Sequence, residues 1–146
     1  MKIALGSDHA GYVLKEKIKY ALKSQKYEII DVGTFSEEPV DYPDYIIPAA
    51  EQVRDKNADL GIVFGGSGNG EVIAANKVKG IRCALCWNIE SAQLAKEHND
   101  ANMISIGSRM IKEADALKIA ETWLTSKFEQ GRHINRIKKI SDYENK

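Results

Sequence analysis

Short hydrophobic runs alternate along this chain with longer segments whose apolar residues recur every three or four positions. The runs predict strands at residues 3–6, 28–32, 60–64, 81–86 and 102–106. The longer segments predict helices at residues 11–26, 45–56, 69–77, 89–98, 112–126 and 132–143. Such alternation is typical of a parallel sheet that is covered by helices on both faces.

The expected fold is a three-layer α/β/α sandwich of the Rossmann or flavodoxin-like kind, formed by residues 1–146 as one domain with an extra C-terminal helix. Right-handed crossovers leave few arrangements of five parallel strands. The order 2-1-3-4-5 is predicted, with its switch point between the first and third strands. Ligands of such sheets bind beyond the carboxyl ends of the strands at that point.

A glycine-rich loop, Phe64-Gly-Gly-Ser-Gly-Asn-Gly-Glu71, joins the third strand to the third helix. A strand, a glycine loop and a helix create a nest of backbone N–H groups at a helix N-terminus, which favours anions. The loop fits neither the dinucleotide fingerprint nor the P-loop, since its glycines are differently spaced and no Gly-Lys-Ser/Thr follows. Glu71 suits proton abstraction beside a nest that binds the resulting oxyanion. A tight turn with a favourable first-turn charge explains Glu71 equally well.

Topology predicts which side chains meet the glycine loop. Asp8 and His9 follow the first strand, so they and Glu71 are expected in one crevice, with Arg109 after the fifth strand on the same edge of the sheet. His98 ends the fourth helix, where a cap against the helix dipole is the favoured interpretation.

Two further features have both a structural and a functional interpretation. Arg132 and Arg136 are four residues apart on one helix face and could fork a phosphate, although a solvated charged face is commoner. Tyr42 lies in a turn, and its side chain either reaches the site or serves the turn alone.

Charge and composition exclude several classes of protein. The 21 basic and 21 acidic residues cancel, so nothing electrostatic indicates nucleic acid or a membrane surface as partner. No apolar run approaches the roughly 20 residues that span a bilayer. The N-terminus lacks a signal-peptide pattern, and a cytoplasmic location is expected.

Cys83 and Cys86 form a C-x-x-C pair, which can indicate redox or metal chemistry. They lie within an apolar run that predicts a buried strand, and the chain has no second ligand pair. A structural role is therefore expected for both thiols, and no metal site is predicted.

These motifs together resemble type B ribose-5-phosphate isomerase of the ribose/galactose isomerase family, over essentially the whole chain. The matching segments, in order, are residues 6–11, 41–43, 65–71, 74–77, 97–100, 107–109 and 131–136. The resemblance implies interconversion of D-ribose 5-phosphate and D-ribulose 5-phosphate through a cis-enediolate, with neither metal nor organic cofactor.

The resemblance also implies residue roles. Ring opening is assigned to Asp8 and His98. The phosphate is assigned to His9, Arg109, Arg132 and Arg136. The sugar and its reacting oxygens are assigned to Tyr42, Ser67, Asn99 and the loop residues Gly66, Gly68, Asn69 and Gly70.

One departure affects the base. Many members of the family carry a Cys at the position of Gly66 and use it for proton transfer. This chain resembles the other branch, in which the acid that closes the loop, here Glu71, is the base. Six-carbon substrates such as allose or galactose 6-phosphate stay open as an alternative. A non-catalytic sugar-phosphate or nucleotide binding protein is a further alternative, which a carboxylate in the nest disfavours.

Helix direction predicts a homodimer with shared active sites. The fourth helix runs back down the sheet, so His98 and Asn99 should lie at the edge opposite Asp8 and Glu71. If their implied roles hold, they serve a neighbour's crevice. Arg132 and Arg136 are expected to cross as well, and pairing of dimers into tetramers is left open.

Overall fold

The predicted strands and helices are present in the computed structural model, which describes all residues from Met1 to Lys146. The strands are β1 (Lys2–Ser7), β2 (Glu28–Asp31), β3 (Leu60–Gly65), β4 (Cys83–Leu85) and β5 (Met103–Gly107). The helices are α1 (Tyr12–Ser24), α2 (Pro43–Arg54), α3 (Asn69–Ala75), α4 (Ile89–Asn99), α5 (Glu113–Thr125) and α6 (Arg132–Glu144).

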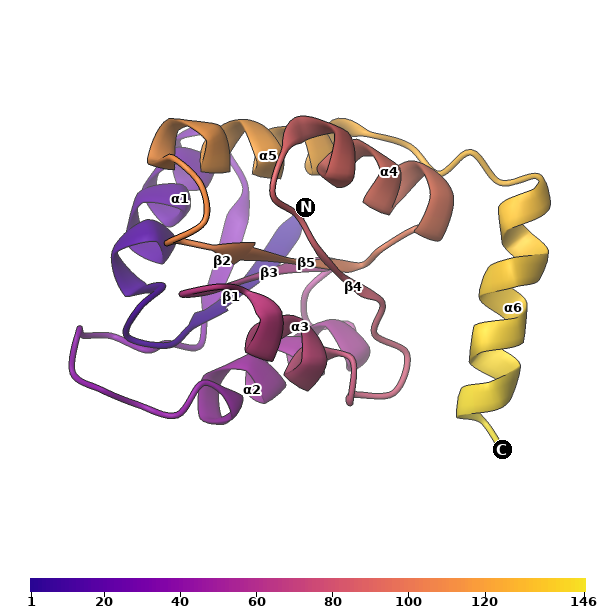
Figure 1. Ribbon diagram of the computed structural model, residues 1–146, viewed down its shortest axis with the longest axis horizontal. Helices are drawn as coiled ribbons and strands as arrows, with labels where there is room; N and C mark the ends of the chain where they lie inside the picture. The colour runs from indigo at the N-terminus through magenta and orange to yellow at the C-terminus, as the bar shows by residue number, and fades with distance from the viewer.

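All five strands are parallel, and helices cover both faces of the sheet, as the alternation predicted. Figure 1 shows α1, α4 and α5 on one face and α2 and α3 on the other. Each face has its own hydrophobic cluster, built around Phe64 and Trp123 under the first layer and around Ile46 and Met103 under the second. The three-layer α/β/α sandwich is therefore confirmed.

The predicted strand order was wrong. The sheet has the order β2-β1-β3-β5-β4, so β5 lies between β3 and β4. The inner position of β5 has a physical reason, because all five of its residues are buried and need a neighbouring strand on each side. β4 has only three residues, two of them half-buried, and such a short strand suits an edge. Right-handed crossovers still hold, since α3 and α4 pack on opposite faces as the chain passes over β5 and returns.

Local sequence accounts for several helix starts. Asn88 caps α4 by accepting from the Ser91 backbone N–H, and the Ser91 hydroxyl accepts from the Asn88 N–H in return. Pro43 occupies the first turn of α2, where its missing N–H is harmless. None of the helices is both long enough and apolar enough to span a lipid bilayer.

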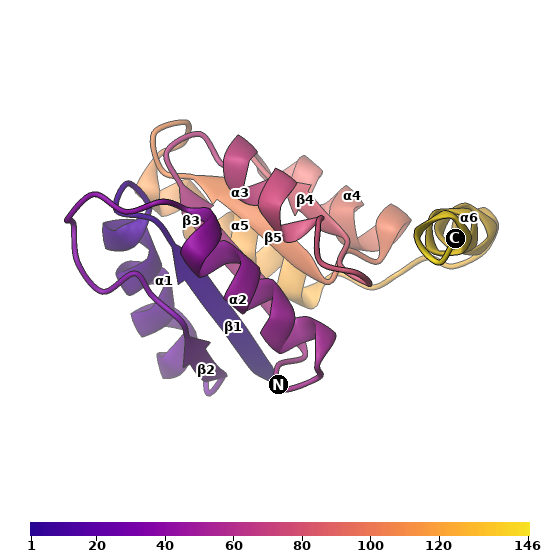
Figure 2. The ribbon, with the colours of Figure 1, turned by 90° about the horizontal axis from the view of Figure 1, so that it is seen from below.

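Helix α6 stands apart from the rest of the chain. Figure 2 views it end-on, separated from the sheet and its covering helices. His133 is its only buried residue, whereas Ile134, Ile140 and Tyr143 are exposed. An amphipathic helix that leaves its apolar side chains uncovered is not stabilised mainly by packing on its own chain.

Candidate active site

The glycine loop is a donor nest at the start of α3. Gly68 caps the helix in the left-handed region, with φ of 83°, and the buried Ser105 hydroxyl donates to its carbonyl at 2.8 Å. The backbone N–H groups of Gly66, Ser67, Gly68 and Gly70 make no hydrogen bond within the chain. These unpaired donors can receive oxyanions or phosphate oxygens.

Glu71 turns back from α3 onto the end of β3. Its carboxylate lies against Gly65, where an added Cβ would come within 1.9 Å of Oε1, and only 3% of the residue is exposed. Burial raises the pKa of the Glu71 carboxyl, and the negative charge of Asp8 raises the pKa further, against an opposing hydrogen bond from the Glu71 backbone N–H. A buried carboxylate with a raised pKa suits proton transfer near neutral pH.

Asp8 and His9 enter the same edge from the end of β1. Asp8 is 9% exposed, and its Oδ1 accepts the Gly11 N–H at 3.0 Å. Gly11 packs on the Phe64 carbonyl at the end of β3, so the loop after β1 lies beside the glycine loop, as the switch point predicted. His9 is half-buried and its Nδ1 accepts the Val40 N–H, which leaves Nε2 as the ring nitrogen free to meet a ligand.

Tyr42 and Arg109 flank the nest from opposite sides. The Tyr42 ring lies against Gly70, where an added Cβ would be 2.7 Å away. The Arg109 guanidinium lies against Gly66, with Nη1 3.1 Å from an added Cβ. Both side chains are exposed, as are those of Ser67 and Asn69, so the nest opens towards solvent between them.

The remaining predicted residues lie elsewhere. His98 and Asn99 end α4, and the Asn99 carbonyl accepts from Arg82, just before β4 begins. This is the amino edge of the sheet, opposite the crevice that holds Asp8 and Glu71. Arg132 and Arg136 are exposed on α6, beyond that edge. The structure thus divides the predicted site into one group at the carboxyl edge and another at the amino edge.

Sequence reasoning missed three residues that shape the crevice but place no polar side chain in it, namely Gly65, Gly107 and Ser105. Gly65 makes room for the Glu71 carboxylate, and Gly107 makes room for the Ser67 carbonyl, which would lie 2.4 Å from an added Cβ. The Ser105 hydroxyl holds the loop in place by donating to the Gly68 carbonyl. Glycines within strands were the available signal, because they mark close backbone approach.

The cysteines are free and buried, as predicted. Burial raises the pKa of Cys86 to about 12. The pKa of Cys83 is raised still further, mainly by burial and to a smaller extent by the nearby Cys86. Thiolate chemistry near neutral pH is therefore disfavoured at both.

Comparison with known proteins gives consistent relatives across the whole chain. The family model described as Ribose/Galactose Isomerase matches residues 3–140. Ribose-5-phosphate isomerase B of Mycolicibacterium paratuberculosis is 49% identical over 146 residues, covering 99% of this chain and 92% of that protein.

Two solved structures are similarly close. Ribose-5-phosphate isomerase B of Clostridium thermocellum superposes with a TM-score of 0.98 at 49% identity, covering 99% of this chain and 98% of that one. The Mycoplasma genitalium enzyme with bound ribulose 5-phosphate gives 0.95 at 38% identity, covering 99% and 97%. Sequence, fold and length agree, and the chain belongs to the Ribose/Galactose Isomerase family.

Proposed function

We propose that this chain is a cofactor-independent aldose–ketose isomerase that interconverts D-ribose 5-phosphate and D-ribulose 5-phosphate. The observation that carries the proposal is the buried Glu71 carboxylate beside a nest of unpaired N–H groups. Relatives named ribose-5-phosphate isomerase B support the five-carbon substrate, and one of them binds ribulose 5-phosphate in its solved structure.

The chemistry follows from that pairing. Glu71 removes the proton from carbon 2 of the open-chain aldose, and the electron pair moves through the carbon 1–carbon 2 bond onto oxygen 1. The resulting cis-enediolate is held by the N–H groups of Gly66, Ser67, Gly68 and Gly70 and by the Ser67 hydroxyl, with Asn69 beside them. Protonated Glu71 then returns its proton to carbon 1, and a proton passes from oxygen 2 to oxygen 1 to complete the ketose.

Two effects account for the rate enhancement. Each oxyanion donor contributes about a hundred- to a thousandfold in other enzymes. A positioned general base adds about a hundred- to ten-thousandfold. In the remaining roles, Asp8 and His98 open the furanose ring, Tyr42 and Asn99 contact the sugar, and the phosphate is bound by His9, Arg109, Arg132 and Arg136.

The Glu71→Gln variant tests the base, since it keeps the shape and removes the basicity. It should lower kcat for ribulose 5-phosphate formation by at least about a hundredfold with little change in KM. Glu90→Gln, an exposed change in the first turn of α4, is the matched control. Retention of more than about a third of wild-type kcat by Glu71→Gln would refute the assignment. Allose 6-phosphate, assayed in parallel, separates five- from six-carbon specificity.

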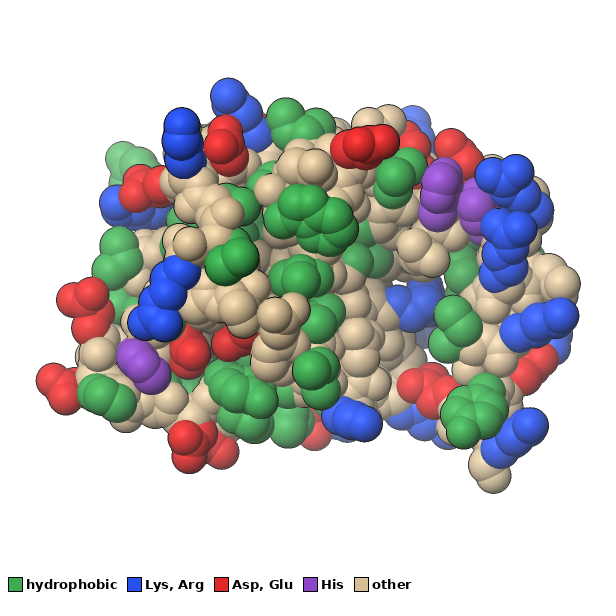
Figure 3. All heavy atoms as spheres, in the orientation of Figure 1, with side chains coloured by type: hydrophobic (Ala, Val, Ile, Leu, Met, Phe, Trp, Pro, Cys, Tyr) green, Lys and Arg blue, Asp and Glu red, His purple; other side chains and the backbone are tan.

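The active site is proposed to be shared across a homodimer. Support comes from the distance in the fold between Glu71 at one sheet edge and His98 at the other. It also comes from α6, which carries exposed apolar side chains, and from the cleft between α6 and the sheet visible in Figure 3. A second copy inserted there would cover both and would bring His98, Asn99 and the α6 arginines to its own crevice.

Subunit mixing tests the shared site. Inactive Glu71→Gln and inactive His98→Asn chains are refolded together, so that mixed dimers hold one intact and one doubly damaged site. Activity should return towards about a quarter of wild type, the share of intact sites in random dimers. Glu71→Gln mixed with Asp8→Asn is the control. Both residues belong to the crevice of their own subunit, so each crevice of a mixed dimer is damaged and no intact site can form. A mixture of the first pair that stays inactive despite subunit exchange would refute the model.

The cytoplasmic location stays a prediction.

A further inference from the structure

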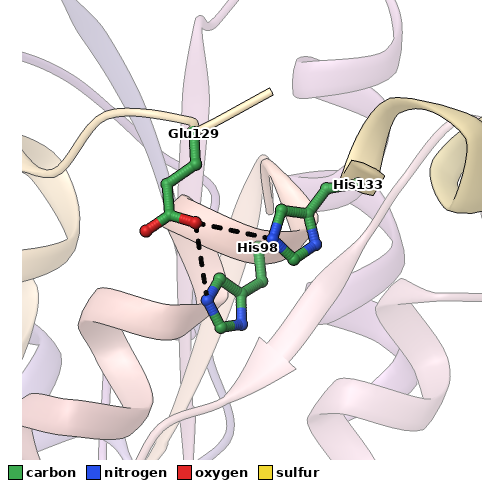
Figure 4. Close-up of side chains that lie close together, drawn as sticks. All are labelled: His98, Glu129 and His133. Atoms are coloured by element: carbon green, nitrogen blue, oxygen red, sulfur yellow. Dashed lines mark ion pairs between the residues drawn. The ribbon is translucent and has the colours of Figure 1, made fainter. Parts of the chain in front are cut away.

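Three side chains with metal-binding atoms converge where α6 meets α4. His98 and His133 stack with ring centroids 4.5 Å apart and planes 15° from parallel. Glu129, in the connection before α6, places Oε2 3.7 Å from His98 Nε2 and 3.5 Å from His133 Nε2. Figure 4 shows both rings turned towards this one carboxylate oxygen. The three ligand atoms all lie within 4.8 Å of one another.

The backbone holds this cluster in place. The Glu129 N–H donates to the Glu97 carbonyl at 3.0 Å, which ties the connection to the last turn of α4 beside His98. Gln130 and Gly131 then adopt positive φ values, and this turn brings His133 back towards the end of α4. His133 is 5% exposed although the rest of α6 is not buried. The start of α6 is thus held to its own chain by this cluster, and its far end is held by the Gly80 N–H, which donates to the Glu144 carboxylate at 3.0 Å.

We propose that His98, Glu129 and His133 form a binding site for a divalent transition-metal ion such as Zn²⁺. Two imidazoles and one carboxylate, with a further position open to water, are a common ligand set for zinc. Metal–ligand bonds of about 2.0–2.2 Å require donors separated by about 3.3 Å. The carboxylate oxygen already approaches this spacing to both nitrogens. The half-exposed His98 ring must rotate out of its stack on His133, so that the lone pairs of both rings point at one ion.

The surrounding charge sets a limit on affinity. Arg132 adjoins His133 in the chain and opposes a cation, whereas Glu97 adjoins His98 and favours one. The imidazoles must be neutral to ligate, so binding should weaken as pH falls. If His98 opens the sugar ring, as the proposed function holds, an ion on its Nε2 would remove it from catalysis, so Zn²⁺ should inhibit the isomerase.

Calorimetric titration of the full-length protein with Zn²⁺ at pH 7.5 tests the site without substrate. One ion per chain is expected, with affinity at least about tenfold lower in Glu129→Gln and in His98→Asn. Glu129 is half exposed and should be replaced without disturbing the fold. Glu90→Gln and His9→Asn control for other carboxylates and for the third histidine. Titration with Co²⁺ should show no thiolate charge-transfer band, which excludes the cysteines as ligands.

Absence of binding, or binding unchanged in both Glu129→Gln and His98→Asn, would overturn the site whatever the enzyme catalyses. A second arm measures isomerase inhibition by Zn²⁺ relative to each variant's own rate without metal. Inhibition should need at least about tenfold more Zn²⁺ in Glu129→Gln than in wild type or Glu90→Gln. Equal inhibition of all three would overturn the link between this ion and His98.

Discussion

Gly65→Ala should separate catalysis from folding. The added Cβ would lie 1.9 Å from Oε1 of Glu71, 2.1 Å from Cδ and 2.4 Å from Oε2, and Cβ contacts below 3.0 Å essentially never occur. The carboxylate must therefore move by about 1 Å. A displacement of that size at a reacting group can lower the rate about a hundredfold. That corresponds to about 2.7 kcal/mol of transition-state stabilisation.

The effect on stability should be small by comparison. The clash is with the end of a flexible side chain, and Gly65 has no left-handed φ that alanine would strain. Overpacking costs about 1–3 kcal/mol, and relief by movement of Glu71 favours the lower end. For a chain of this size, that lowers Tm by about 2–4 °C per kcal/mol.

Gly61→Ala is the matched control, on the same strand but at the other end from the crevice. Its Cβ would meet the flexible end of Met103 at 2.8 Å, which is also below 3.0 Å although less close than the contact at Gly65. Both variants should have a lower Tm than wild type in thermal unfolding followed by circular dichroism, but only Gly65→Ala should lose kcat. A folded Gly65→Ala enzyme that keeps more than about a third of wild-type kcat would refute the placement of the base.

Three other perturbations test the surrounding site. In Asp8→Asn, loss of the neighbouring negative charge should lower the raised pKa of Glu71, so the acidic limb of residual kcat/KM should move to lower pH, because the base acts when deprotonated; a shift to higher pH would contradict this. Cys83→Ala with Cys86→Ala should leave turnover normal in folded protein, and wild type should resist iodoacetamide, whereas inactivation that substrate prevents would indicate a thiol in the site. Arg132→Ala should raise KM far more for ribose 5-phosphate than for unphosphorylated sugars, and an equal rise for both would make α6 merely structural.

The raised pKa of Glu71 also has a consequence for stability. Its folded-state pKa lies above the unfolded one, so the buried carboxylate contributes stability only when protonated, and this contribution is lost as pH rises through the folded pKa. Above that pH the ionised carboxylate is a destabilising charge in the crevice. Such a cost is expected where a site is shaped for chemistry.

Local features were predictable because local residues determine them. The glycine loop with Glu71 after it, the Asn88 capping of α4 and the buried cysteines all follow from short stretches of chain. The cluster of His98, Glu129 and His133 could not be predicted in this way. Its members come from α4, a connection and α6, and the turn at Gln130 and Gly131 that unites them depends on positive φ values at two positions.

The wrong strand order concerns function as well as fold. In the predicted order, strand four would separate β5 from β3, and Arg109 would start about 10 Å from the nest, two strand spacings away. In the observed order β5 is the neighbour of β3, and the chain after it pairs directly with the glycine loop. The Ser108 N–H donates to the Gly65 carbonyl at 2.8 Å and the Arg109 N–H to the Gly66 carbonyl at 3.0 Å. These two bonds place a guanidinium beside the nest and satisfy the loop carbonyls, so that the loop can direct its N–H groups to a ligand. The burial of all of β5, which favours its inner position in the sheet, therefore also assembles the proposed anion site.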